Sequence, residues 1–83
     1  MLHIHYFASL REQLNCDSEE LIWQDSFATI DDVSKYLSNT NAIWKNILAK
    51  QTVLVAINQQ MAEPCSSIND GDEIAFFPPV TGG

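Results

Sequence analysis

The first and last segments of the chain alternate between two sets of side chains, as β-strands do because successive residues point to opposite faces. Residues 2–7 place Leu2, Ile4 and Tyr6 on one face, and His3, His5 and Phe7 on the other. Residues 74–77 place Ile74 and Phe76 on one face, and Ala75 and Phe77 on the other. These patterns predict a first and a last strand, and the last one ends at two prolines, which cannot donate to a sheet ladder.

Three shorter strands are predicted between these two. Residues 19–24 form the first of them, with acidic residues that keep its start in solvent. Residues 53–58 are apolar with almost no alternation, which is typical of a central strand buried on both faces. A turn at residues 59–60 leads into a short strand at residues 61–62, and a tight turn over residues 69–72 precedes the last strand.

Helical patterns separate the strands. Ser9 and Glu12 have the spacing of a capping box and predict a short helix that Asn15 ends in a left-handed conformation. Thr29 is the expected N-cap of the main helix. The apolar stripe of that helix comprises Ile30, Val33 and Leu37. Residues 42–49 repeat helical spacing more weakly and predict a second helical segment.

This order of elements predicts a two-layer α+β domain. The two terminal strands are both apolar and most simply lie side by side in the middle of one sheet, with the main helix across one face. Eighty-three residues leave no room for a second core, so we expect one domain over residues 1–83. Residues 79–83 are expected to form an extended C-terminal tail.

The charge balance excludes several classes of function. Four Lys and Arg against eleven Asp and Glu give a net charge of −7, which is too acidic to build a nucleic-acid site and disfavours anionic membranes. No apolar stretch approaches the roughly 20 residues of a membrane span, and the N-terminus lacks the basic start of a signal peptide. We therefore expect a cytoplasmic protein, whose acidic surface suits a basic protein partner.

The side chains offer little chemistry of their own. His3 and His5 share a strand face, but no third ligand has recognisable spacing, so we interpret them as surface histidines and predict no metal site. Cys16 and Cys65 lack a CxxC spacing and a cationic neighbour, which favours two reduced thiols without catalytic function, although a bridge between them stays open. Arg11 either contacts an acidic site on a partner or, as we favour, stays solvated.

The C-terminus is the remaining candidate. Two of the three glycines are the last two residues, Gly82 and Gly83. Two prolines hold the preceding segment extended, Val80 and Thr81 keep it stiff, and the tail can reach about 16 Å beyond the sheet. An end without side chains can enter a narrow channel, and its carboxylate can be activated as an acyl adenylate. The alternative is a frayed tail.

Three stretches carry a resemblance to a known family: Phe7-Ala-Ser-Leu-Arg-Glu-Gln-Leu, Val55-Ala-Ile-Asn-Gln, and Asp70-Gly-Asp-Glu-Ile-Ala-Phe-Phe-Pro-Pro-Val-Thr-Gly-Gly. With them, the whole chain resembles the small subunits of molybdopterin synthase. A Gly-Gly end is shared by all ubiquitin-like sulfur carriers, and the specificity comes from its combination with the preceding Phe-Phe-Pro-Pro and with the Phe-Ala-x-Leu-Arg-Glu opening. The resemblance implies the β-grasp fold of ubiquitin, an α+β fold whose mixed sheet has helices packed on one face.

The resemblance further implies a sulfur carrier. An ATP-dependent adenylating enzyme would activate the Gly83 carboxylate, and a persulfide sulfur donor would convert it to a thiocarboxylate. The tail would then enter the large synthase subunit and give its sulfur to cyclic pyranopterin monophosphate, forming the dithiolene of molybdopterin for the molybdenum cofactor. Catalytic side chains are expected on the large subunit, so this chain is a co-substrate that binds no cofactor. The family expectation is a heterotetramer.

Strand alternation also predicts where a partner binds. We assume that the helix covers the face of each terminal strand that was named first above. Phe7 and Phe77 then point to the uncovered face and form an apolar patch. Such a patch on a soluble monomer marks an interface. Met61 is a third member with an adaptable side chain. The family's binding patch lies at the positions that match these three. The partner-binding set is completed by the residues that lead to Gly82 and the reactive Gly83, namely Pro78, Pro79, Val80 and Thr81.

Three other functions stay open from the sequence. The chain could be a sulfur carrier of another pathway, such as thiamin thiazole formation or tRNA thiolation. It could be a ubiquitin-like modifier whose Gly83 forms isopeptide bonds with lysines. A structural interaction domain would require neither Gly82 nor Gly83.

Overall fold

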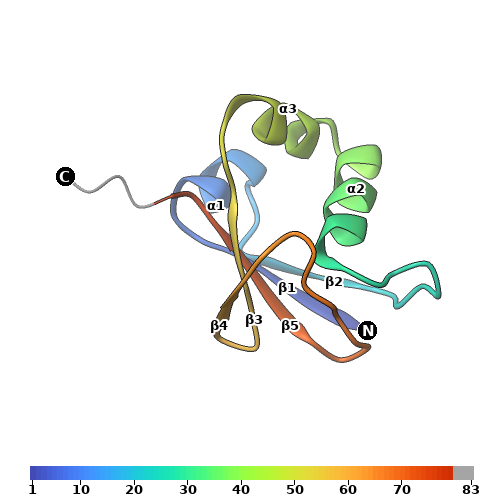
Figure 1. Ribbon diagram of the computed structural model, residues 1–83. Helices are drawn as coiled ribbons and strands as arrows, with labels where there is room; N and C mark the ends of the chain where they lie inside the picture. Colours follow the sequence, from blue (N-terminus) through green and yellow to red (C-terminus); the bar gives the residue numbers. More distant parts are fainter. Residues whose placement is uncertain (80–83) are drawn as a thin grey trace.

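The first and last strands of the chain lie side by side in the middle of one sheet, and the helices lie together on one side of it (Figure 1). The computed structural model describes residues 1–79. Its elements are β1 (Leu2–Tyr6), α1 (Ala8–Leu14), β2 (Ser18–Leu21), α2 (Ile30–Thr40), α3 (Ala42–Lys50), β3 (Leu54–Ile57), β4 (Gln60–Ala62) and β5 (Glu73–Phe77). The strand order across the sheet is β2-β1-β5-β3-β4.

The terminal strands β1 and β5 are parallel neighbours, with Ile4 beside Ile74 and Tyr6 beside Phe76. The other neighbouring pairs, β1 with β2, β3 with β4 and β3 with β5, are antiparallel. The sheet is therefore mixed, and β5 is its central strand. The predictions of adjacent terminal strands and of a two-layer α+β architecture are confirmed.

The core lies between the sheet and the helices. The predicted inner faces of β1 and β5 are buried, and so is the predicted stripe of α2. From α3, Trp44 and Ile47 are buried, and the Trp44 ring meets the Phe76 ring edge-on at a centroid distance of 5.0 Å. An edge-on aromatic pair stabilises the fold beyond the apolar area that it buries, so α3 contributes to the core.

One partly buried network of hydrogen bonds ties three elements together. The indole Nε1 of Trp44 donates a hydrogen bond to the Tyr6 hydroxyl at 3.2 Å, and that hydroxyl donates to the Glu19 carboxylate at 2.6 Å. Burial, together with the Glu19 carboxylate, raises the pKa of the Tyr6 hydroxyl well above its usual range. The hydroxyl therefore stays protonated and continues to join β1, β2 and α3.

The start of α2 has the predicted N-cap, Thr29. The Asp32 carboxylate accepts from the backbone N–H groups of Ala28 and Thr29, both at 2.9 Å, and these hydrogen bonds hold the pKa of Asp32 below its usual value. The loop before β5 completes the cap, because the next two helical N–H groups donate to the carbonyls of Ser66 and Pro64. These contacts satisfy donors that a helix start leaves unpaired.

The predicted capping box at Ser9 and Glu12 is wrong. The N-cap of α1 is Phe7, which has no side-chain cap hydrogen bond, and Ser9 lies inside the helix. The reason is that β1 runs into α1 without a loop: the Phe7 N–H still donates to the Phe76 carbonyl at 3.1 Å, and the chain turns at Ala8 with a φ of 53°. The predicted left-handed end at Asn15 is confirmed by a φ of 54°.

The strand predicted over residues 19–24 is shorter than expected. The β1–β2 ladder ends where Leu21 pairs with Leu2, because β1 offers no residue beyond Leu2 for pairing. Ile22 is consequently 76% exposed, and Trp23 instead packs edge-on against Phe27. No helix within residues 1–79 is long and apolar enough to cross a membrane.

Candidate functional site

The sheet has an apolar patch on the face opposite the helices. The register fixes its members, because Tyr6, Phe76 and Val55 lie side by side towards the helices and the alternate residues point the other way. Phe77 pairs with Leu54, and Ala56 pairs with both Ala75 and Met61. We define the apolar patch as Phe7, Leu54, Ala56, Met61, Ala75 and Phe77.

Two members of the patch are strongly exposed. Met61 is 65% exposed on the edge strand β4, and Phe7 is 49% exposed at the end of β1. Phe77 is half-buried at the end of β5. Because Phe7 follows Tyr6 and donates its N–H to the Phe76 carbonyl, it lies beside Phe77 across the parallel pair. The structure thus brings the three predicted apolar residues to one face of the sheet.

Polar side chains border the apolar patch on the same face. His5 Nε2 lies 3.5 Å from Glu73 Oε1, and His3 Nδ1 lies 3.9 Å from Glu20 Oε1. All four side chains are well exposed, so their interactions are screened by solvent. They form a polar border along one side of the apolar patch, and polar residues at the edge of an apolar centre are common in protein interfaces.

The tail begins where β5 ends, next to the apolar patch. Pro78 is half-buried and Pro79 is exposed. The remaining predicted site residues lie outside the described residues, namely Val80, Thr81, Gly82 and Gly83. The apolar patch therefore lies beside the point from which the chain continues to its C-terminus.

Three members of the apolar patch were not predicted from the sequence, namely Leu54, Ala56 and Ala75. The prediction that residues 53–58 are buried on both faces is wrong in part: Val55 and Ala56 are buried, but Leu54 and Ile57 are half-buried. Leu54 lies on the face that the helices leave open, whereas Ile57 lies on the helix side beside Ile74 and is only partly buried against the core. The strand order places Leu54 and Ala56 beside Phe77 and Ala75, and this order is a tertiary property. Residues 54–57 are all apolar, so the sequence offered no alternation that could have distinguished the two faces.

The other candidate side chains lie outside this arrangement. Cys16 and Cys65 are both free thiols, and Cys16 Sγ donates to the Ser18 carbonyl at 3.0 Å. Arg11 Nε lies 4.0 Å from Asp17 Oδ1, with both side chains exposed. An exposed pair at this distance contributes little to stability, which agrees with a solvated Arg11.

Comparison with known proteins places the chain in a family. The sequence matches the ThiS family over residues 4–83. It is 45% identical to the molybdopterin synthase sulfur carrier subunit of Haemophilus influenzae and 34% identical to that of Escherichia coli. Both alignments cover all of this chain and all of the relative.

Solved structures share the fold. The crystal structure of SAMP1 from Haloferax volcanii matches with a TM-score of 0.78 at 24% identity, covering 99% of this chain and 98% of that one. In the Helicobacter pylori complex of subunits 1 and 2 of molybdopterin-converting factor, one chain matches with a TM-score of 0.69 at 19% identity, over 99% and 97% of the two chains. The predicted β-grasp fold is confirmed. The chain belongs to the ThiS family, together with the sulfur carrier subunits of molybdopterin synthases.

Proposed function

We propose that this chain is the sulfur carrier subunit of a molybdopterin synthase. The observation that carries the proposal is the full-length relationship to such subunits at 45% identity, together with a family match that extends through the terminal Gly83. The pair Gly82 and Gly83 is the feature that this chemistry needs, because an end without side chains fits a narrow channel.

The proposed chemistry takes place at the Gly83 carboxylate. A carboxylate reacts poorly with sulfur nucleophiles because it lacks a good leaving group. An ATP-dependent adenylating enzyme therefore first converts it to an acyl adenylate and releases pyrophosphate. The terminal sulfur of a persulfide donor then displaces AMP and forms an acyl disulfide with Gly83. A second thiol cleaves this S–S bond reductively, which releases the Gly83 thiocarboxylate and leaves the donor sulfur in a disulfide with that thiol. The thiocarboxylate delivers its sulfur to cyclic pyranopterin monophosphate in the large subunit. ATP belongs to the adenylating enzyme, and the chain itself binds no cofactor.

The apolar patch is the proposed docking surface for the large subunit. A small domain exposing Phe7 and Met61 on one face buries them on association, and the burial of aromatic and Met side chains is a main contribution to interface affinity. The position of the patch beside the base of the tail supports this role, because docking there would direct the tail into the partner. Two free cysteines favour a reducing compartment, and we place the reaction in the cytoplasm.

Intact-mass spectrometry tests the proposal. The chain is incubated with ATP, the adenylating enzyme of this pathway and a persulfide sulfur source. We expect a gain equal to the replacement of one oxygen by one sulfur, and no gain in a variant that lacks Gly83. Addition of the large subunit and cyclic pyranopterin monophosphate should then restore the original mass and yield molybdopterin.

Two results would contradict the proposal. An unchanged mass in the presence of an active enzyme would reject the carrier chemistry. A stable thiocarboxylate that the large subunit and the pterin precursor leave intact would assign the carrier to another sulfur pathway.

A further inference from the structure

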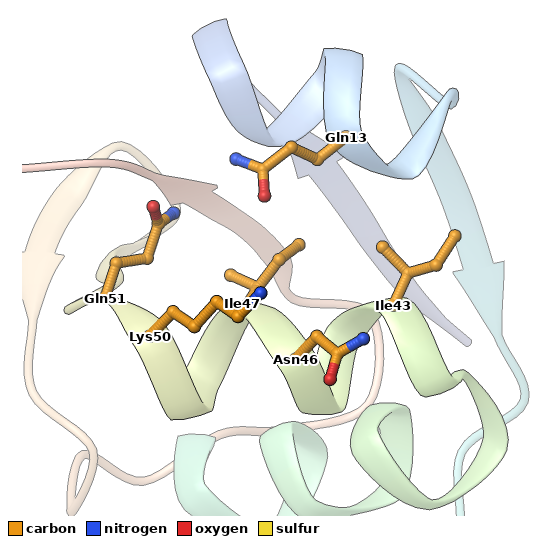
Figure 2. A pocket seen from close by; sticks show the side chains of 6 residues that line it. All are labelled: Gln13, Ile43, Asn46, Ile47, Lys50 and Gln51. Atoms are coloured by element: carbon orange, nitrogen blue, oxygen red, sulfur yellow. The ribbon is translucent and has the colours of Figure 1, made fainter.

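The cationic side chains of this protein are confined to its helical layer. All four belong to helices, namely Arg11 in α1, Lys35 in α2, and Lys45 and Lys50 in α3. Figure 2 shows Lys50 on α3, at a groove between α1 and α3. The five strands within residues 1–79 contain neither lysine nor arginine, so the open face of the sheet has no cationic side chain of these two types.

The polar border of the apolar patch consists of His3, His5, Glu20 and Glu73. The register places Glu20 of β2 and Glu73 of β5 on either side of His3. His3 Nδ1 lies 3.9 Å from Glu20 Oε1, and His5 Nε2 lies 3.5 Å from Glu73 Oε1. His5 also lies beside Ala75, which is a member of the apolar patch. The polar border and the apolar patch therefore form one continuous surface.

The two glutamates of the polar border differ from the neighbouring carboxylates. Asp70 pairs with the N-terminal ammonium, and Asp72 accepts hydrogen bonds from the N–H groups of two asparagines. Glu19 accepts a hydrogen bond from a tyrosine hydroxyl on the helical side. Within residues 1–79, the ion-pair partners of Glu20 and Glu73 are the two histidines of the border. Because both side chains are more than half exposed, their carboxylates are accessible to a partner.

The histidines make the charge of the polar border depend on pH. Histidine changes charge between about pH 5 and 8, whereas exposed carboxylates stay ionised over most of this range. The other residues that lie beside His5 on the neighbouring strands, Ser18 and Ala75, carry no charge. Neutral histidines therefore leave the polar border with the negative charges of its two glutamates, and protonated histidines neutralise them.

We propose that Glu20 and Glu73 bind arginine or lysine side chains of the synthase large subunit. This inference rests on the proposed function, because it assumes that the large subunit covers the apolar patch. A subunit that docks there also reaches the adjoining polar border, and cationic groups are the electrostatic complement of a face without lysine or arginine. The protonated histidines compete with the partner for the same two carboxylates. Docking therefore weakens as the pH falls.

Two double variants test the contact at a constant pH of about 8. Glu20→Gln with Glu73→Gln removes both carboxylates of the polar border, whereas Glu12→Gln with Asp25→Asn removes two exposed charges outside the sheet. Calorimetry with the large subunit should show that the first pair weakens binding by about fivefold, since exposed ion pairs are individually weak. The second pair should change the dissociation constant by less than about twofold. Circular dichroism confirms that both variants are folded.

The competition is tested by comparing two pH profiles. His3→Asn with His5→Gln keeps a polar group near each ring nitrogen that faces a glutamate but removes the change of charge. Between about pH 8 and about pH 5.5, the dissociation constant of the wild type should rise about fivefold more than that of this variant. Titration of the large subunit itself is common to both proteins and cancels in the comparison.

Three results have opposite consequences for the two proposals. Equal effects of the two acidic double variants would overturn the contact of Glu20 and Glu73, and parallel pH profiles would overturn the competition. Loss of wild-type binding to the large subunit at about pH 8, or failure to form the thiocarboxylate, would instead reject the proposed function. Because these wild-type measurements are made separately, failure of the carrier function is distinguished from failure of this contact.

Discussion

Adjacent residues of the same type have opposite roles in this protein. Phe76 is 2% exposed and packs against Trp44 in the core, whereas Phe77 is half-buried on the open face and borders the exit of the tail. Nothing in their chemistry distinguishes them, and the alternation of β5 alone places one in the core and the other on the open face, where we propose that it binds a partner. Their separate substitution therefore separates the two properties.

We predict that Phe77→Ala leaves the fold intact and weakens binding to the large subunit by about tenfold or more, because interface aromatics contribute a large share of affinity. Calorimetry measures the binding, and thermal unfolding monitors the fold. Ile22→Ala is the matched control, since Ile22 is 76% exposed away from the apolar patch and its loss should change neither quantity. Unfolding of the Phe77 variant would show instead that this side chain belongs to the core.

At the scale of elements, α2 is held at its start by contacts of two origins. Its own sequence supplies Thr29 and the Asp32 carboxylate, which accepts two backbone N–H groups. The loop between β4 and β5 supplies carbonyl acceptors for Ile30 and Asp31. The local cap and the tertiary contact together position the helix that covers the sheet.

The Asp32 contribution should depend on pH. Its folded pKa is lowered below the ordinary value of 3.8, chiefly by the hydrogen bonds from Ala28 and Thr29, so the charged form stabilises the fold above that value. We predict that Asp32→Ala lowers the melting temperature at neutral pH. The difference from wild type should shrink as the pH falls below 3.8 and through the folded pKa. Asp31→Ala controls for the helix dipole, and a constant difference across this range would contradict the assignment.

At the scale of the whole molecule, the net charge of −7 acts over longer distances than any single contact. An acidic carrier that docks on a basic surface is steered towards it, and salt screens this attraction. For the proposed complex, we therefore expect the charge to act mainly on the rate of encounter and the apolar patch to act on the lifetime of the complex.

We accordingly predict that the association rate constant with the large subunit falls by about tenfold between about 0.05 M and 0.5 M NaCl. The dissociation rate constant should change much less. Stopped-flow fluorescence of the half-buried Trp23 follows the reaction. A fluorescent label on the partner provides a second signal. An association rate that is insensitive to salt would exclude electrostatic steering.

Most of the secondary structure could be predicted from local patterns. The alternation of β1 and β5, the stripe and cap of α2 and the left-handed Asn15 all follow from interactions between residues close in the chain. The predictions failed where the neighbour was distant in sequence. β2 ends early because β1 does, and α1 begins at Ala8 because Phe7 remains bonded to β5.

The same distinction applies to function. The sequence by itself supplied the terminal Gly-Gly on which the proposed chemistry rests, and it determined the members Phe7, Met61 and Phe77 of the apolar patch, because both features can be read along the chain. Only the tertiary structure decided that Leu54 and Ala56 join this patch and that Glu20 and Glu73 lie on either side of His3. These groupings depend on strand order and helix packing, which bring distant residues together and leave no mark in the local sequence.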